Sequence, residues 1–267
     1  MYSHIQNFLI DIDGVLLNDN LVIDGAKIAL EYLERNDFRY ALVTNTTRIS
    51  KAMLLERLRA HEFAIDGSRV ITPVTATIDH IKRKMKAARC YLIAPDDLKS
   101  EFYDAGLTII ESEASVDFVI LGYDMRIDFG VLDIAFRLIK NGAHLVAMHE
   151  SKSFPAQPKP HIGLGAFVRA LVYSTNTKAT VIGKPNVAFF QAAMRTISAE
   201  INETVMIGDS LQGDIIGARH AGLIAIMVRT GNFDASELQN SELQPDVIID
   251  SIKQLPELVE GWRLGNK

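Results

Sequence analysis

Two aspartates, Asp11 and Asp13, lie near the start of the chain at the end of the apolar run Phe8–Ile12, and Gly14 follows them. In an open α/β sheet, ligands bind outside the carboxyl ends of the strands, and a glycine permits the tight turn that exposes both carboxylates. One carboxylate can attack a phosphorus atom while the other protonates the leaving oxygen, and a hard divalent cation between them relieves their repulsion. Taken alone, this motif is equally well explained as a strand-end turn with two solvated aspartates.

Three further groups of polar residues follow later apolar runs. The hydroxyl of Thr44 and the amide of Asn45 can donate to phosphate oxygens, although such a pair can also cap a following helix. Lys184, in a Gly-Lys-Pro sequence, can neutralise phosphate charge in a transition state, although a surface lysine before a turn has the same pattern. Asp209 is a candidate metal ligand. Asp214, five residues further on, either orients metal-bound waters or Lys184, or is an acidic residue favoured at a helix N-terminus.

The metal that these residues indicate is magnesium. Asp11, Asp13 and Asp209 give an all-oxygen ligand set with room for waters and a phosphate oxygen, which suits Mg²⁺. The four groups follow four predicted strands in one order, so that chance is a poor explanation for all of them together.

The elements that must position these residues are predicted strands alternating with helices. Short runs rich in β-branched residues and bounded by polar residues or glycine are typical of buried parallel strands. These runs are Phe8–Ile12, Tyr40–Thr44, Ala179–Ile182, Thr204–Ile207, Ile224–Val228 and Val247–Ile249. Helices are predicted at Gly25–Arg35 (buried face Ala26, Ala29, Leu30 and Leu33), at Ser50–Arg59 (buried face Met53, Leu54 and Leu58, with Ser50 as N-cap) and at Asp214–Ala221. The alternation predicts a doubly wound parallel α/β sheet.

The middle of the chain, residues 76–177, has strand and helix patterns of its own. Its strand-like runs are Ala88–Ala94, Phe118–Gly122 and His144–His149, and its helical patterns are Thr75–Met85, Phe129–Asn141 and Leu164–Ser174. We therefore expect a second α/β domain at 76–177, inserted into a core made of 1–75 and 178–267. The proline-rich segment Ser153–His161 is predicted to be a loop, and the tail after Asp250 a terminal helix.

Composition narrows the class of function. The chain has 267 residues, 48% hydrophobic and 23% charged, with a net charge of −5. This balance argues against a nucleic-acid partner, which would require a basic surface, but it still allows a small anionic substrate.

One cysteine, Cys90, excludes a disulfide within the chain and fits a reducing compartment; we expect it to fill an apolar stretch rather than act as a nucleophile. No signal peptide and no apolar run of about 20 residues is present, so we expect a cytoplasmic protein without a membrane partner.

The sequences DIDGV, TN, GKP and GDSLQGD, in this order, resemble the motifs of the haloacid dehalogenase superfamily. The resemblance extends over nearly the whole chain, and the long insert between TN and GKP is similar to the C2 cap of the NagD-like, class IIA branch. It implies a Rossmann-like core with an α/β cap and a Mg²⁺-dependent phosphatase that acts on small phosphorylated metabolites.

The resemblance also implies a role for each matching residue. Asp11 matches the nucleophile and a metal ligand, and Asp13 the general acid/base, whose backbone carbonyl also binds the metal. Thr44 and Asn45 match the phosphate-binding second motif. Lys184 matches the third-motif lysine, and Asp209 the fourth-motif metal ligand. The chain departs from the family where a polar Asn-x-Asp signature often follows a cap strand: it has His149-Glu150-Ser151-Lys152 instead.

Other functions stay open at this point. A carbon–halogen hydrolase could use the same Asp11 nucleophile, but it needs no magnesium and has no use for Asp13 and Asp209. A phosphomutase would have a different cap, and a catalytically weak phospho-ligand-binding protein would not require the complete set. His149 is either a substrate contact or a structural histidine. The sequence identifies neither the phosphorylated compound nor the assembly, for which a homodimer is one option.

Overall fold

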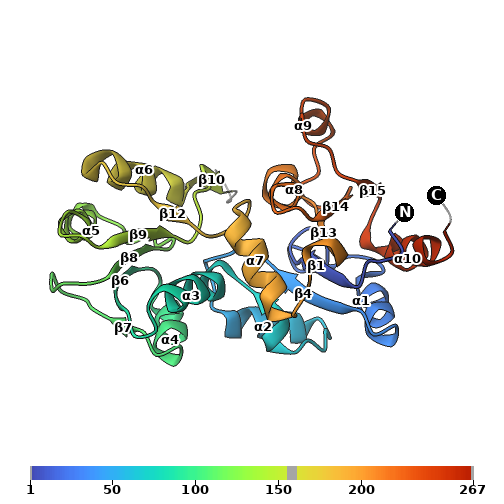
Figure 1. The fold of residues 1–267 in the computed structure, drawn as a ribbon, viewed down its shortest axis with the longest axis horizontal. Helices are drawn as coiled ribbons and strands as arrows, with labels where there is room; N and C mark the ends of the chain where they lie inside the picture. Colours follow the sequence, from blue (N-terminus) through green and yellow to red (C-terminus); the bar gives the residue numbers. More distant parts are fainter. Residues whose placement is uncertain (1, 155–160, 266–267) are drawn as a thin grey trace. The chain divides into compact units, whose positions relative to one another are not determined.

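The computed structural model describes residues 2–154 and 161–265, and the chain folds into two compact units (Figure 1). Unit 1 comprises Met1–Thr44, Leu55–Ile71 and Lys184–Lys267. Unit 2 comprises Asn45–Leu54 and Thr72–Gly183, so that a short segment directly after Thr44 belongs with the insert. Each unit contains a parallel sheet of its own.

Unit 1 is built on a sheet whose strands, within the described residues, follow the order β15-β14-β13-β1-β4-β5. The strands are β1 (Asn7–Asp11), β4 (Arg39–Val43), β5 (Val70–Ile71), β13 (Thr204–Gly208), β14 (Ile224–Val228) and β15 (Val247–Ile249). All neighbours pair in parallel, with Asp11 beside Val43 and Ile10 beside Ile207. The carboxyl ends of β4, β1 and β13 therefore lie at one edge of the sheet. Thr44, Asp11 and Asp209 lie at these three strand ends, in that order along the edge.

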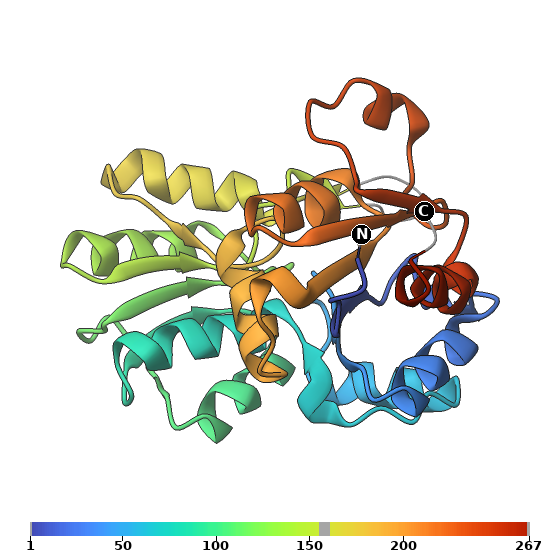
Figure 2. The ribbon, with the colours of Figure 1, turned by 45° about the vertical axis from the view of Figure 1, so that its right-hand side comes forward.

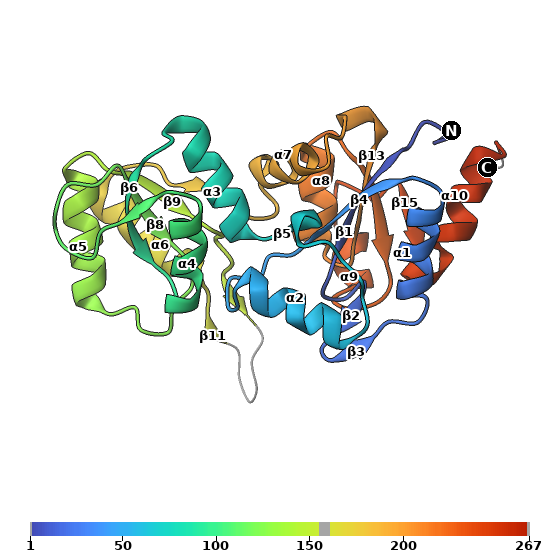
Figure 3. The same ribbon diagram turned by 90° about the horizontal axis from the view of Figure 1, so that it is seen from below.

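Helices cover both faces of this sheet, as a doubly wound fold requires. The helices of this part of the chain are α1 (Ala26–Arg35), α2 (Lys51–Ala60), α7 (Val187–Thr196), α8 (Gly217–His220), α9 (Ala235–Gln239) and α10 (Leu255–Arg263), with 3-10 turns η1 (Gly67–Arg69), η2 (Ile201–Glu203) and η4 (Ile252–Gln254). The first four residues of α2 belong to unit 2 and the rest to unit 1. Figure 3 shows α1 and α10 on one face and α7 and α8 on the other, and Figure 2 gives a second view of these helices. A small hairpin, β2 (Leu17–Asn18) with β3 (Leu21–Val22), follows β1.

The structure confirms the predicted buried faces of helices α1 and α2, with one exception. All four residues expected on the inner face of α1 are buried. On α2, Leu54 and Leu58 are buried, and the hydroxyl of Ser50 accepts a hydrogen bond from Met53 N at 3.3 Å, as expected of an N-cap. The prediction for the Met53 side chain was wrong: it is 49% exposed. Leu54 and Leu58 are four residues apart and define the buried stripe, from which Met53 is displaced by about 100°.

The predicted helix Asp214–Ala221 begins earlier and in a different form. Leu211–Ile216 (η3) is a π-helical turn, and α8 continues from it. The hydroxyl of Ser210 accepts a hydrogen bond from Gly213 N at 3.1 Å and so caps this turn. Asp214 is therefore inside the turn and fully buried, rather than at an exposed helix start.

Unit 2 contains a second parallel sheet, with the strand order β12-β9-β8-β6-β7 in the described residues. The strands are β6 (Arg89–Ile93), β7 (Thr108–Ile109), β8 (Phe118–Leu121), β9 (His144–Ala147) and β12 (Thr180–Val181), and the helices are α3 (Pro73–Lys84), α4 (Asp96–Asp104), α5 (Phe129–Lys140) and α6 (Leu164–Thr175). Helices α5 and α6 lie on one face of the sheet, and α3 and α4 on the other (Figures 1 and 3). This is the α/β pattern predicted for the insert.

Two predictions for this region need correction. The strand predicted at Ala179–Ile182 was assigned to the first sheet, but β12 pairs with β9, Thr180 beside Val146. It stays with unit 2 because backbone hydrogen bonds continue along β9, up to Gly183 N donating to Met148 O at 2.8 Å. Second, the ends of the predicted loop Ser153–His161 pair as strands β10 (Ser153–Phe154) and β11 (His161–Ile162), while 155–160 lie outside the described residues.

The terminal helix predicted after Asp250 is confirmed by α10. Among the helices of residues 2–154 and 161–265, none combines the length and the apolar character needed to cross a bilayer.

Candidate active site

At the carboxyl edge of the unit 1 sheet, a buried lysine lies between two buried aspartates. Asp11 is the last residue of β1, and Lys184 is the first residue of unit 1 after the insert. Lys184 Nζ donates to Asp11 Oδ1 at 2.7 Å and to Asp214 Oδ1 at 2.6 Å. The Lys184 side chain is 4% exposed, so it is not the surface lysine that its sequence context also allowed.

A third carboxylate completes a compact acidic cluster. Asp11, Asp209 and Asp214 each offer one oxygen, and these three oxygens lie within 4.8 Å of one another. Asp209 follows β13, which is paired directly with β1. Asp214 belongs to the π-helical turn, where its Oδ2 also accepts a hydrogen bond from Ser210 N at 3.1 Å. Two of these buried carboxylates, Asp11 and Asp214, thus bind one ammonium group, and the third lies beside them.

Burial makes Asp11 and Asp209 poor anions in the absence of further positive charge. Burial raises the pKa of Asp11 well above its ordinary value, against the opposing charge of Lys184. Burial, followed by the charge of Asp214, raises the pKa of Asp209 to about 6. Burial alone would lower the pKa of Lys184, but the charges of Asp11 and Asp214 raise it above its ordinary value, so the lysine stays protonated. The cluster is therefore short of positive charge, and it is a chemically suitable place for a cation.

Residues outside the four predicted motifs hold Asp209 in place. Asp209 Oδ2 accepts hydrogen bonds from Asn232 N at 2.7 Å and from Asn232 Nδ2 at 2.9 Å. A Cβ atom on Gly231 would lie 2.1 Å from Asp209 Oδ2, and one on Gly14 would lie 1.8 Å from it. The available signal was the sequence Thr230-Gly231-Asn232 close after a predicted strand. Thr230 ties this loop to the first one, because its hydroxyl donates to Gly14 O at 2.5 Å.

Asp13 lies outside the acidic cluster. Its side chain is 46% exposed, and its Oδ1 accepts a hydrogen bond from Arg57 Nη1 at 2.9 Å. Thr44 Oγ1 lies 3.4 Å from Asp13 Oδ2, a long contact for a hydrogen bond between oxygens. In the described residues the third carboxylate beside Asp11 and Asp209 is Asp214, which the sequence left undecided, rather than the side chain of Asp13.

The two residues of the second motif fall in different units. Thr44 is buried at the end of β4, and its backbone N–H donates to Ile71 O at 3.1 Å in unit 1. Asn45 belongs to unit 2, where it lies against Gly183: a Cβ atom on this glycine would be 2.5 Å from Asn45 Oδ1. Only a glycine allows this close approach without displacing the Asn45 side chain.

His149 and Cys90 have structural surroundings within unit 2. His149 is buried, its Nε2 lies 3.1 Å from Thr47 Oγ1, and its Nδ1 accepts a weak hydrogen bond from Ser151 N at 3.4 Å. Burial lowers the pKa of His149 to about 4, so a neutral ring carries its hydrogen on Nε2 and donates it to Thr47. Cys90 is buried in β6, and burial raises the pKa of its thiol to about 12, as expected of a residue that fills the core.

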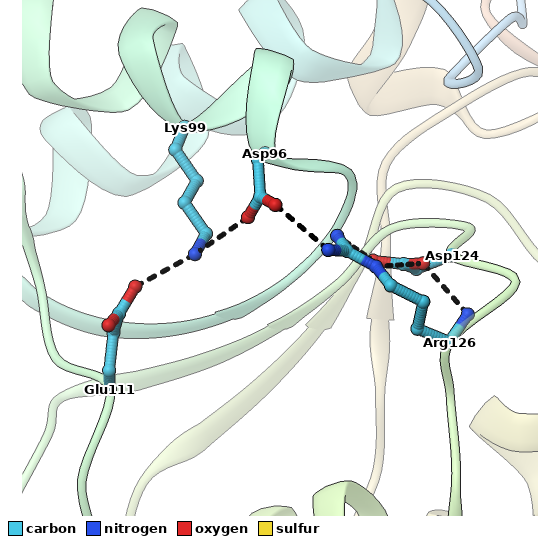
Figure 4. Close-up of polar contacts among 5 residues, drawn as sticks. All are labelled: Asp96, Lys99, Glu111, Asp124 and Arg126. Carbon is cyan, nitrogen blue, oxygen red and sulfur yellow. Dashed lines mark hydrogen bonds and ion pairs between the residues drawn. The ribbon is translucent and has the colours of Figure 1, made fainter.

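Unit 2 also has a charged network at the carboxyl ends of its strands (Figure 4). Glu111, Lys99, Asp96, Arg126 and Asp124 form a chain of ion pairs, with oppositely charged atoms 2.8–3.0 Å apart. Hydrogen bonds from Arg126 and Lys99 lower the pKa of Asp96 to about 2. The network joins helix α4, which follows β6, to the loops that follow β7 and β8.

Two hollows adjoin this network, and both are lined by residues of unit 2. The first, of about 350 Å³, has the strand residues Tyr91 and Ile93 in its wall. The second, of about 570 Å³, has Arg48, Tyr123 and Met125 in its wall. Asp96, Asp124 and Arg126 line both hollows. The second hollow has a volume typical of small-molecule sites.

Comparison with known proteins identifies relatives of this chain. A family model described as haloacid dehalogenase-like hydrolase matches residues 8–108, and a second model for such hydrolases matches residues 181–255. The chain is 36% identical to human haloacid dehalogenase-like hydrolase domain-containing protein 2, over 91% of each protein. It is 30% identical to an acid sugar phosphatase of Staphylococcus epidermidis, over 91% of this chain and 93% of the relative. The crystal structure of a 4-nitrophenylphosphatase from Thermotoga maritima superposes with a TM-score of 0.88, at 26% identity, over 97% of this chain and 98% of the other.

Proposed function

Since the chain belongs to the haloacid dehalogenase-like hydrolases, we propose that it is a Mg²⁺-dependent phosphatase of small phosphorylated metabolites that forms an aspartyl phosphate on Asp11. One observation carries this proposal: Asp11, Asp209 and Asp214 are buried around a single lysine at the end of β1. The names of two similar proteins, an acid sugar phosphatase and a 4-nitrophenylphosphatase, support phosphate esters as the substrate class.

The donor set fits a hard divalent cation. Three buried carboxylates oppose one ammonium group, and all of their ligand atoms are oxygens, the atoms that Mg²⁺ prefers. Asp11 and Asp209 would hold the ion, with the backbone carbonyl of Asp13 as a further ligand. Bound there, Mg²⁺ would neutralise charge on the carboxylates and on a phosphate oxygen, which favours an anionic transition state. Asp214 would keep Lys184 oriented through the hydrogen bond at 2.6 Å.

In the first step, a carboxylate oxygen of Asp11 attacks the phosphorus atom and the bond from phosphorus to the leaving oxygen breaks. The leaving oxygen takes a proton from Asp13, so that an alcohol departs and an acyl phosphate remains on Asp11. Lys184 provides a fixed positive charge beside Asp11, where negative charge accumulates on the phosphoryl oxygens. Thr44 and Asn45 would donate to these oxygens and orient the phosphoryl group.

In the second step, a water molecule attacks the phosphorus atom of the acyl phosphate. Asp13, now a carboxylate, takes the proton from this water, and the bond between phosphorus and the Asp11 oxygen breaks. Inorganic phosphate leaves, Asp11 is again a carboxylate and Asp13 is again protonated. The exposure of Asp13 suits this role, since it must exchange its proton with both the leaving group and water.

We assign catalysis to unit 1 and substrate selection to unit 2, as a core and its cap. The core chemistry acts on the phosphoryl group alone, so other residues must recognise the rest of the substrate. Unit 2 contains Asn45 and, three residues further along the chain, Arg48 in the wall of the 570 Å³ hollow. This hollow is our candidate small-molecule site within unit 2.

Phosphate and halide release together test the proposed function. The purified protein is incubated with 4-nitrophenyl phosphate, a panel of sugar phosphates and 2-chloropropionate, each with EDTA or with Mg²⁺. We expect phosphate release that requires Mg²⁺, is lost in Asp11→Asn and is faster for some sugar phosphates than for others. Halide release, or full phosphatase activity in EDTA, would contradict the proposal.

A further inference from the structure

Arg57, on helix α2, holds Asp13 from a distant part of the chain. Its Nη1 donates to Asp13 Oδ1 at 2.9 Å, and its Nη2 donates to the backbone carbonyl oxygen of Asp19. Asp19 lies in the turn between β2 and β3, where it adopts a left-handed backbone conformation with φ at 51°. One guanidinium group therefore connects the loop after β1, the hairpin that follows it and helix α2.

The other contacts near Asp13 fix the backbone of its loop but not its side chain. Gly14 N donates to Leu17 O at 2.6 Å, and Leu17 N donates to Ile12 O at 3.0 Å. The side chain is half-exposed, and its contact with Thr44 is 3.4 Å long. Arg57 is thus the strongest contact that the Asp13 carboxyl group makes in the structure.

This contact distinguishes the two oxygens of Asp13. Oδ1 is occupied by Arg57, whereas Oδ2 faces the hydroxyl of Thr44. Thr44 follows Val43, the residue paired with Asp11, so Oδ2 is directed to the edge of the sheet at which Asp11 ends. An acid that must protonate a leaving group there needs this orientation, and a shift of about 1 Å in such a group can cost about 10²-fold in rate.

We propose that Arg57 is a positioning residue for proton transfer: it holds Asp13 Oδ1 so that Oδ2 exchanges the proton with the leaving group and with water. The inference rests on the proposed phosphatase function and extends it to a residue outside the motifs. The alternative is that Arg57 only braces the hairpin through Asp19. Because half-exposed ion pairs contribute little to folding, removing Arg57 should leave the protein folded.

Rates for two classes of ester separate these alternatives. An alkyl phosphate has a poor leaving group and needs the acid, whereas 4-nitrophenyl phosphate needs it much less. We expect Arg57→Ala to lower kcat by about 10²-fold for glycerol phosphate and by at most a few-fold for 4-nitrophenyl phosphate. Arg57→Lys, which keeps one donor for Asp13, should retain more of the alkyl activity. Arg59→Ala, an exposed arginine two residues further along α2, is the matched control and should behave as wild type.

A double-mutant cycle with Asp13→Asn gives the second readout. If Arg57 acts through Asp13, Arg57→Ala should cause no further loss of alkyl activity once Asp13 is replaced, because the group that it positions is gone. Additive losses, or equal losses for alkyl and aryl esters, would overturn the proposal in favour of a brace.

The same experiments keep this inference separate from the proposed function. Normal alkyl activity in Arg57→Ala, alongside an inactive Asp11→Asn, would reject the positioning role alone. A wild-type protein that releases phosphate from neither ester would reject both.

Discussion

Asp11, Asp209 and Asp214 are buried side by side, and this burial determines their chemistry. Burial raises the pKa of Asp11 and of Asp209, and the single charge of Lys184 offsets only one of the three negative charges. A bound divalent cation would remove this conflict and keep Asp11 ionised, the form that can attack phosphorus. In the proposed mechanism, the cation would therefore set the protonation state of Asp11 as well as bind the phosphate.

This dependence predicts a linkage between pH, stability and Mg²⁺. The pKa of Asp209 is raised from 3.8 to about 6, and that of Asp11 is also raised, so between about pH 4 and pH 6 the folded protein binds more protons than the unfolded one. These groups should therefore make the metal-free protein less stable as pH rises through this interval. Mg²⁺ competes with the protons, so its affinity should increase with pH over the same range, by up to about tenfold per unit for each proton released.

Thermal unfolding with and without Mg²⁺ checks this prediction. The increase in Tm on adding Mg²⁺ should be clearly larger at about pH 7.5 than at about pH 5, and calorimetry should detect proton release on binding at about pH 5. An equal increase in Tm at both pH values would show that the raised carboxyl groups are not the metal ligands.

The candidate residues predicted from the sequence follow recognisable strands, whereas Asp214 was left undecided and Arg57 was not among the candidates. Asp11 and Asp209 lie at the ends of short apolar runs, so their neighbouring positions could be expected from parallel pairing. The burial of Asp214 depends on a π-helical turn, which has no periodic signature in the sequence. Arg57 reaches Asp13 from 44 residues away, and no local pattern indicates such a contact.

At the scale of elements, the loops after β1 and β14 must approach Asp209 closely. Gly14 has φ at 86°, and a Cβ atom there would lie 1.8 Å from Asp209 Oδ2. Gly14→Ala should therefore displace Asp209, weaken Mg²⁺ binding at least about tenfold and lower activity, beyond the backbone cost of about 1–2 kcal/mol for a left-handed alanine.

Gly106→Ala is the matched control for this variant. Gly106 also has a left-handed conformation, with φ at 79°, but a Cβ atom there would meet nothing within 4 Å. The Gly106→Ala variant should lose a free energy of unfolding similar to the backbone cost in Gly14→Ala, as measured by urea unfolding. Its Mg²⁺ affinity, measured by calorimetry, should equal that of the wild type. Equal Mg²⁺ affinities in the two variants would show that the approach of Gly14 to Asp209 is unimportant.

A residue just after β9 contacts the segment that begins with Asn45. His149 donates to the hydroxyl of Thr47, two residues after Asn45. His149→Ala should leave this buried hydroxyl without its donor, cost about 1–3 kcal/mol in the free energy of unfolding and weaken competitive inhibition by inorganic phosphate. His144→Ala, at the exposed start of the same strand, is the control. Unchanged phosphate inhibition in His149→Ala would separate His149 from phosphate binding.

Long elements could be predicted from the sequence, whereas short ones depended on tertiary pairing. The five-residue strands β1 and β4 have apolar runs that indicate buried parallel strands. Strands β5, β7 and β12 contain two residues each, too few for a periodic pattern, and form only because a longer neighbour provides hydrogen-bond partners. For this reason the position of β12 in the second sheet could not be predicted.

At the scale of the whole molecule, the chain passes between the units at residues of the candidate site. Thr44 ends the first segment of unit 1, and Asn45 begins unit 2. The chain returns to unit 1 between Gly183 and Lys184, the lysine bound to Asp11. The insert was predictable because residues 76–177 repeat the strand–helix alternation. The additional segment Asn45–Leu54 was not, because its place in unit 2 depends on contacts such as Ser50 N donating to Asp97 Oδ2 at 3.2 Å.

The most direct test of the account is to capture the covalent intermediate. The protein is mixed with 4-nitrophenyl phosphate and Mg²⁺, quenched in acid within one turnover and treated with borohydride, which reduces an aspartyl phosphate to homoserine. Peptide mass spectrometry should find homoserine at position 11 only when both ester and Mg²⁺ were present, and not in Asp11→Asn. An unmodified Asp11 from a sample quenched during active turnover, or homoserine at another aspartate, would contradict the assignment of Asp11 as the nucleophile.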